Sequence, residues 1–521
     1  MRFFIAESSG RLSFGRLIPC RFGTTPFGFH GVDVLTTVRR RLSTTADRLA
    51  SVPAFLTAAA ALGFMVALAR ADAGKEEAHN VRLVGFHDLA ARSAYQPTIR
   101  KQGDRWIAYI GSHGGRSANP LNGQLEENGT SILDVTDPRA PRLLFHIPGE
   151  RGREVPGRET GGAQMTRVCA GAELPKADRS KIYLLRTFGD ARQEIWEVSA
   201  PDRPQLVSQF GQFRSTHKNE WECASGIAYI PGSHDAYRAT RVTHVYDLSD
   251  PAKPVFIRAF GLADQLKDAK GYLPGQIHGP ISAWPVKERV YFGYGTDARG
   301  VAQIVDRAKL LSGPPEPTAQ NLLAPQIARI DLPEFMGAHT AFPLLGVEIA
   351  DFRPAEKTLR DFLVVVNEVN TTVCNAPRQM AYFIDITDEK HPLGVASYDV
   401  PEASGGFCSR GGRFGAHASH ENRTPVYYRR LMLFSWFNAG VRVVDVRDPY
   451  RPREVGYYIP AKTPKTDLRC ADEEKKTGCV PVIQINNVEV DDRGYLYAVD
   501  RANSGLFVLE LTGEARALAN F

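Results

Sequence analysis

The chain has 521 residues, of which 43% are hydrophobic and 23% are charged, the ordinary composition of a globular protein. Its formal net charge is +6, and the basic residues form no stripe with interleaved aromatic residues, which argues against a nucleic-acid-binding protein. The length alone allows two or three domains, so the internal organisation of the chain has to decide their number.

Residues 1–73 are predicted to be an N-terminal extension and signal peptide. Arg39, Arg40 and Arg41 precede an apolar run from Val52 to Ala69, and small residues suited to cleavage follow at once. We therefore expect a periplasmic or secreted protein. The alternative is an uncleaved membrane anchor, although the run is shorter than the ~20 residues of a comfortable span. No later segment reaches that length, so no membrane span is expected in the mature chain.

A short segment recurs along the rest of the chain. TSILDVTDPRAPRLL begins at Thr130, and related segments lie around the acidic residues Asp134, Glu197, Asp247, Asp306, Asp385, Asp445 and Glu510. Each copy alternates in the period-2 pattern of a β-strand. In the clearest copies an Asp-Pro turn follows, which ends the strand because proline has no N–H to donate. An acid that recurs in every copy is expected to be structural, since one catalytic residue is not needed seven times.

Each repeat is predicted to contain four strands, and seven such sheets packed in a ring make a seven-bladed β-propeller over residues 80–521. The last repeat has only three strands, and the segment from Val81 resembles the missing fourth. We therefore expect this N-terminal strand to complete the last blade and close the ring. The rival folds are a β-solenoid, whose repeat is shorter, and an array of β-sandwiches, which would not share a strand between the two ends.

Six cysteines follow the predicted signal peptide. Cys470 and Cys479 bracket a charged insertion and are the expected disulfide pair, while the pairing of the other four stays open. An exported protein permits such bonds. The chain has no C-x-x-C motif, which argues against a thiolate zinc site.

Histidines stand at the start of the first strand in three consecutive predicted blades, at His278, His339 and His417. Because the first strand of each blade lines the central channel, these side chains are expected to converge at one mouth. His217 lies near the start of the third blade at a different offset. Neutral imidazole is the commonest metal ligand. The four histidines therefore predict an axial metal site, with iron or copper favoured over zinc.

Other polar residues take the corresponding place in the remaining blades. Gln96, Gln164 and Asn487 are expected to donate and accept hydrogen bonds with a ligand or with channel water. Glu222 and Glu421 lie close enough in sequence to the histidines to act as further ligands, or to orient a ring nitrogen. We expect Glu222 in the second of these roles.

A plainer interpretation stands beside this one. A histidine at the start of an inner strand can cap backbone groups or bond water in a wet channel. The protein is then a non-catalytic interaction scaffold of the cell envelope, whose loops bind a partner protein. On the first interpretation it binds a metal ion or a small molecule, and it can be a metal-dependent enzyme. The sequence leaves both open, together with the substrate and the reaction.

The repeats also carry a resemblance. ILDVTDPRAP, VYDLSDPAKP, FIDITDEKHP and VRVVDVRDPYRP resemble the signature of the LVIVD-repeat family of exported bacterial β-propellers. The resemblance extends over about residues 80 to 511. It implies the propeller fold and export. It implies no catalytic residue, because most members of the family have no assigned activity.

Overall fold

The computed structural model describes residues 75–152, 160–349, 359–372, 374–375, 377–472 and 475–521. The chain divides into two compact units, Met1–Leu68 and Ala69–Phe521, and all described residues belong to the second. The predicted N-terminal extension and signal peptide lie outside them. Among the described residues, no helix combines the length and the apolar character needed to cross a membrane.

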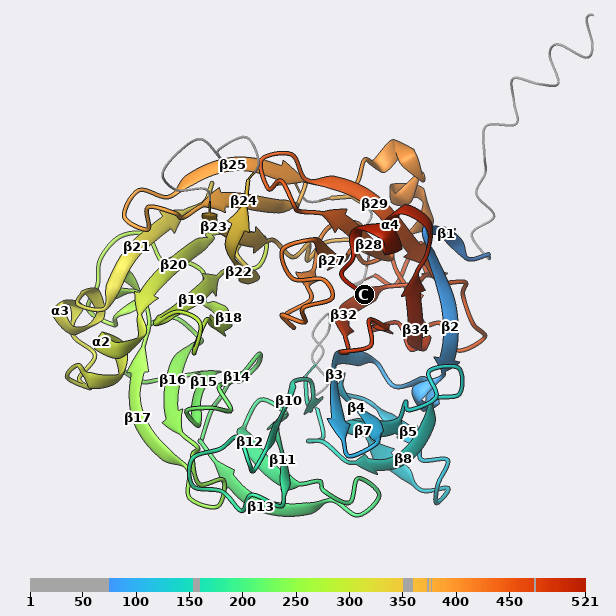
Figure 1. Cartoon of the computed structure of the whole chain (residues 1–521), viewed down its shortest axis with the longest axis horizontal. Coiled ribbons are helices and arrows are strands. Elements are labelled where there is room, and N and C mark those ends of the chain that lie inside the picture. Colours follow the sequence, from blue (N-terminus) through green and yellow to red (C-terminus); the bar gives the residue numbers. More distant parts are fainter. Residues whose placement is uncertain (1–74, 153–159, 350–358, 373, 376, 473–474) are drawn as a thin grey trace, which may run out of the picture. The chain divides into compact units, whose positions relative to one another are not determined.

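The second unit is a seven-bladed β-propeller, as predicted (Figure 1). Each blade is an antiparallel sheet of four main strands, innermost first in blades one to six. Blade one contains β3 (Ala94–Gln102), β4 (Arg105–His113), β7 (Thr130–Asp134) and β8 (Arg142–Ile147). Blade two contains β10 (Thr166–Ala170), β11 (Ile182–Phe188), β12 (Arg192–Glu197) and β13 (Gln205–Phe210). Blade three contains β14 (Glu220–Trp221), β15 (Ile227–Gly232), β16 (Val242–Asp247) and β17 (Val255–Phe260).

The remaining blades repeat this order. Blade four contains β18 (Ile277–Ser282), β19 (Arg289–Tyr294), β20 (Val301–Asp306) and β21 (Gln326–Asp331). Blade five contains β22 (Thr340–Glu348), β23 (Leu359–Val366), β24 (Ala381–Asp385) and β25 (Leu393–Tyr398). Blade six contains β26 (Ala418–Ser419), β27 (Leu431–Ser435), β28 (Val441–Asp445) and β29 (Arg453–Ile459). Blade seven contains β32 (Ile485–Val490), β33 (Leu496–Asp500), β34 (Gly505–Leu511) and β2 (Val81–His87).

Smaller elements decorate the blades. They are the strands β9 (Gly162–Ala163), β5 (Arg116–Ala118), β6 (Leu125–Glu127), β30 (Leu468–Arg469) and β31 (Val480–Pro481), and the helices α2 (Arg307–Ser312), α3 (Ala319–Leu323) and α4 (Gly513–Leu518). The short helices lie outside the sheets, so the blades alone form the frame of the site.

The ring closes through its N-terminal strand. β2 pairs antiparallel with β34, with Val81 opposite Leu511 and His87 opposite Leu506, which confirms the predicted closure. β1 (Glu77–His79) adds a further strand to the outer edge of blade six. Apolar side chains of blades one and seven then pack together without exposure, among them Ile110 and Val508. The closing strand removes an open edge that two neighbouring blades would otherwise expose.

The recurring acid has the structural role that its repetition predicts. The Asp134 carboxylate accepts a hydrogen bond from the backbone N–H two residues further on, at 3.0 Å, and Asp445 does the same at 3.1 Å. Asp306 instead caps the first turn of α2. Glu510, in the last copy, pairs with Arg82 of the closing strand. In each case the carboxylate stabilises the end of a strand rather than reaching the axis.

Three disulfide bonds link the six described cysteines. Cys470 pairs with Cys479, as predicted, and the pairs left open by the sequence are Cys169–Cys223 and Cys374–Cys408. None of these thiols is free to bind a metal ion. Disulfides persist in oxidising compartments, so the pairing supports the expectation of export.

Candidate functional site

The four predicted histidines meet at one mouth of the propeller axis. The ring centroids of His217 and His278 lie 4.5 Å apart, those of His278 and His339 lie 3.8 Å apart, and those of His339 and His417 lie 4.6 Å apart. They come from blades three, four, five and six. His278 is the second residue of β18, and the other three precede the first strands of their blades. Each blade therefore delivers one imidazole to the same place.

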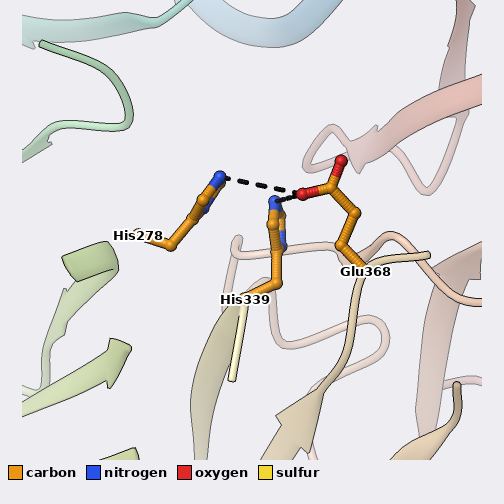
Figure 2. Close-up of side chains that lie close together, drawn as sticks. All are labelled: His278, His339 and Glu368. Atoms are coloured by element: carbon orange, nitrogen blue, oxygen red, sulfur yellow. Dashed lines mark ion pairs between the residues drawn. The ribbon is translucent and has the colours of Figure 1, made fainter. Parts of the chain in front are cut away.

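Glu368 completes this group, and the sequence analysis did not identify it. Its Oε2 lies 3.9 Å from Nε2 of His278 and 3.9 Å from Nε2 of His339, and both ring nitrogens point toward the carboxylate (Figure 2). Its Oε1 lies 3.7 Å from Nε2 of His417. Ligand atoms of His278, His339 and Glu368 all lie within 4.8 Å of one another. We call these three residues the axial triad.

Neighbouring groups fix the orientation of the rings. Nδ1 of His339 lies 2.9 Å from the Thr340 hydroxyl, and Nδ1 of His417 bonds the backbone carbonyl of Asn486. In both rings Nε2 is left facing Glu368, the arrangement that second-sphere hydrogen bonds produce at metal sites. His339 Nε2 is buried and has no hydrogen-bond partner among the described residues. Buried polar atoms are normally satisfied, so this nitrogen marks a place for a ligand or an ion.

Burial dominates the protonation of the site. It lowers the pKa of His217, His278, His339 and His417 well below the usual value, and neighbouring imidazoles and cations act in the same direction. Burial also raises the pKa of Glu368, although Arg413 and Arg501 oppose that shift. The imidazoles are therefore neutral at pH 7, which is the state that binds metal ions.

His217 lies beside the axial triad rather than within it. Its Nε2 is 3.2 Å from the Tyr95 hydroxyl, and the Tyr95 ring also contacts His113 and His417 edge-on. The different offset of His217 in the sequence corresponds to this separate position. It packs against His278 and closes one side of the site.

Glu368 lies where the second strand of blade five ends. Because strands one and two are antiparallel, the end of β23 is at the same mouth as the start of β22, with Val366 opposite Thr340. The Glu368 backbone N–H donates to the Thr296 carbonyl of blade four at 3.0 Å. The polar pair Asn367-Glu368 directly after the apolar run of β23 was the available signal. A comparison of second-strand ends, alongside the first-strand starts, would have found it.

Glu222 does not join the site, and its predicted role there is corrected. Its carboxylate binds the guanidinium of Arg307 at 2.6 Å and accepts hydrogen bonds from Tyr229 and Ser282. These partners belong to blades three and four, and the carboxylate ties the two blades together. Blade three had two residues that fitted the alignment, and sequence alone did not show which one faces the axis.

The other predicted polar residues divide between two places. Gln164 lines the cavity above the histidines. Asn487 instead donates to the side-chain oxygen of Gln96, and Gln96 donates to Glu489 at 3.4 Å. Gln96 and Asn487 thus bond each other and a buried charged cluster.

That cluster, which we call the axial plug, consists of Arg167, Lys218, Glu220, Glu421 and Glu489. Glu421 pairs with Lys218 and with Arg167, and Arg167 also contacts Glu220 at 3.2 Å. Lys218 additionally donates to Thr340 at 3.1 Å, next to His339. Burial raises the pKa of Glu489 to about 8, with the charge of Glu421 acting in the same direction. The predicted role of Glu421 as a metal ligand is replaced by this ion pairing.

Glu489 should make stability fall as the pH rises. A carboxyl whose pKa is higher in the folded state binds a proton that the unfolded chain releases, so stability is lost between the two pKa values, about 4.5 and about 8. Glu489→Gln removes this effect. We expect the variant to gain about 2 kcal/mol relative to the unaltered protein between pH 6 and pH 8, measured by urea unfolding at both pH values. A constant difference between the two proteins would show that Glu489 does not titrate in this range.

A cavity of about 1380 Å³ opens above the site. Tyr95, His113, His217, His278 and Glu368 form part of its wall. This volume exceeds that of a usual small-molecule pocket. A ligand in the cavity would reach Nε2 of His278 and the Glu368 carboxylate directly.

Comparison with known proteins gives a fold likeness and no family. No family model matches the chain, and no curated protein matches it. Among solved structures, Sqt1 of Chaetomium thermophilum bound to the N-terminus of the ribosomal protein L10 shares 8% identity, with a TM-score of 0.45. That match covers 82% of this chain and 99% of the other. A second Sqt1 structure from the same organism shares 11% identity over 83% of this chain and 98% of the other, with a TM-score of 0.43.

Proposed function

We propose that this protein is an exported β-propeller that binds a divalent transition-metal ion at the axial triad, with iron(II) as the favoured ion, and presents it to a small molecule in the cavity. The observation that carries the proposal is the convergence of His278, His339 and Glu368 from two blades. Two imidazoles and one carboxylate with open positions are the donor set of non-haem iron(II) sites.

The spacing of the donor atoms supports this assignment. Protein nitrogen and oxygen ligands lie about 2.0–2.2 Å from a transition metal, so two of them on one ion are about 3–4 Å apart. The two imidazole–carboxylate separations of 3.9 Å fall in this range. His417 is a further donor on the other carboxylate oxygen. The unsatisfied Nε2 of His339 gains a partner when the ion binds.

The chain's own groups also determine what such a site can do. When bound, iron(II) supplies a Lewis acid and a redox centre. His278 and Glu368 face the cavity, so a substrate approaches from that side, while the axial plug fills the space behind His339. Arg413 and Arg501 lie 3.4 Å and 3.9 Å from Glu368 and hold its carboxylate in place. Export rests on the predicted signal peptide and is supported by the disulfides.

Metal analysis tests the proposal. The protein is purified without an affinity tag, incubated anaerobically with iron(II), and desalted before elemental analysis. We expect about one iron per chain in the unaltered protein and none in a His278→Ala/His339→Ala variant. His244→Ala is the control, because His244 is a buried histidine that packs against Phe213 and Phe256, outside the axial triad.

The contrary outcome is equally clear. If the unaltered protein retains no stoichiometric metal, or if the double variant retains as much, the axial triad is not a metal site. The interaction-scaffold interpretation would then stand in its place.

A further inference from the structure

The wall of the axial cavity is strongly basic. Among the described residues that line it are six arginines and one lysine, against the two carboxylates Asp190 and Glu368. The formal excess is therefore seven minus two, or five positive charges, before any histidine is counted. A low-dielectric cavity of one sign concentrates ligands of the opposite sign. This wall therefore selects for an anionic ligand.

Most of these cations already have partners in the protein. Arg214, at the rim, pairs with Asp235 at 2.8 Å. Arg238 donates to backbone carbonyls, including that of Asp264 at 2.9 Å. Arg413 and Arg501 contact Glu368. Their charges are at least partly used in holding loops and the triad carboxylate.

Arg241 differs from the rest. It is 8% exposed and lines the cavity, yet its guanidinium makes no hydrogen bond or ion pair to any described residue. Its Nε is a buried donor without a partner. Burial lowers the pKa of Arg241 to about 10, against the weaker influence of Tyr95, Glu368 and Asp190, so the side chain is still charged at pH 7. A buried cation without a partner costs stability, and arginines in such positions are typical of sites that take an anion.

The position of Arg241 connects it to the axial triad. It immediately precedes β16, and its carbonyl accepts a hydrogen bond from Ile277 N–H at 3.3 Å, one residue before His278. After burial and the neighbouring imidazoles, the charge of Arg241 is a further cause of the lowered pKa of His278 and His339. The guanidinium and the triad therefore share one cavity.

We propose that Arg241 anchors an anion-binding site in this cavity, and that the site takes a small organic acid through its carboxylate or phosphate group. The planar guanidinium offers two parallel N–H donors, which match two oxygens of either group. The anchored group would satisfy the unpartnered donors of Arg241. That the remainder of the molecule faces the metal rests on the function proposed above, whereas the anion site itself needs no metal.

Titration calorimetry on metal-free protein tests the anion site, with inorganic phosphate and benzoate as separate probes in a buffer without other oxyanions. We expect one or both probes to bind the unaltered protein at millimolar concentration or below. The probe that binds more tightly identifies the anionic group. Arg241→Gln is expected to weaken binding by about tenfold or more, since it removes charge-assisted hydrogen bonds. Arg214→Gln, at the exposed rim, is expected to change it by less than about threefold.

A stability measurement separates binding from a structural role. Without an anion, Arg241→Gln is expected to unfold at the same denaturant concentration as the unaltered protein or at a higher one, because an unpartnered buried charge has been removed. A lower unfolding midpoint together with unchanged probe binding would show that Arg241 is structural. Failure of both probes to bind the unaltered protein would also overturn the proposal.

The same titration in the His278→Ala/His339→Ala variant distinguishes the two proposals. Retained anion binding with lost metal binding supports independent anchoring by Arg241. If the protein binds no metal at all, the anion result still stands or falls by Arg241→Gln alone.

Discussion

Replacing Lys218 with methionine is expected to lower the free energy of unfolding by about 3–5 kcal/mol, the cost of removing one partner of a buried ion pair. Lys218 has no exposed side-chain surface and pairs with the buried carboxylate of Glu421. Burial alone would raise the pKa of Glu421, but Lys218 and Arg167 outweigh it and bring it below the usual value. Without Lys218, a charged carboxylate would keep only Arg167, which it shares with Glu220.

Chemical denaturation of three proteins checks this expectation. Lys253→Met is the matched control, because Lys253 is 82% exposed and pairs loosely with Asp250 at 3.7 Å, so a change below about 1 kcal/mol is expected. Adding Glu421→Gln to Lys218→Met removes both charges and should recover part of the loss. A Lys218→Met variant as stable as the control would mean that the axial plug does not depend on this pair.

Iron(II) is expected to stabilise the folded protein by about 4 kcal/mol when its free concentration is about 1,000 times its dissociation constant. This expectation rests on the proposed metal site. An ion that binds only the folded chain shifts the unfolding equilibrium by mass action. Glu368→Gln keeps the size of the side chain but removes the carboxylate charge, and we expect most of the stabilisation to disappear. Anaerobic denaturation with and without iron(II) measures the difference.

Glu222→Gln provides the control for this experiment. Glu222 is also a buried glutamate, 6% exposed, but it binds Arg307 instead of facing the triad. The variant should lose stability in both conditions and keep the full increment from iron(II). An increment that survives in Glu368→Gln, or that is lost equally in both variants, would argue against Glu368 as a ligand.

Much of the fold was predictable because its causes are local. The alternating runs around Asp134 and Asp445 specify strands, and each acid caps the turn that follows. Repetition of this pattern determined the number of blades. The missing fourth strand of the last repeat predicted the pairing of β2 with β34. A nine-residue separation similarly favoured the Cys470–Cys479 disulfide.

The candidate site was predictable only in part. His278, His339 and His417 stand at equivalent points of consecutive repeats, and the symmetry of a propeller brings such points together. Glu368 and Arg241 lie on other strand ends and have no counterparts in the repeat. Glu222 occupied a plausible position but turns to Arg307, 85 residues further along the chain.

The sequence by itself therefore determined the propeller, its seven blades, its closure and the meeting of the histidines, because period-2 patterns, turn chemistry and internal repetition act over short distances. Only the tertiary structure decided which carboxylate faces those histidines, which one ties two blades together, and which arginine is left without a partner. These choices depend on contacts between blades, where residues far apart in sequence compete for the same buried charge. No local pattern records the outcome of that competition.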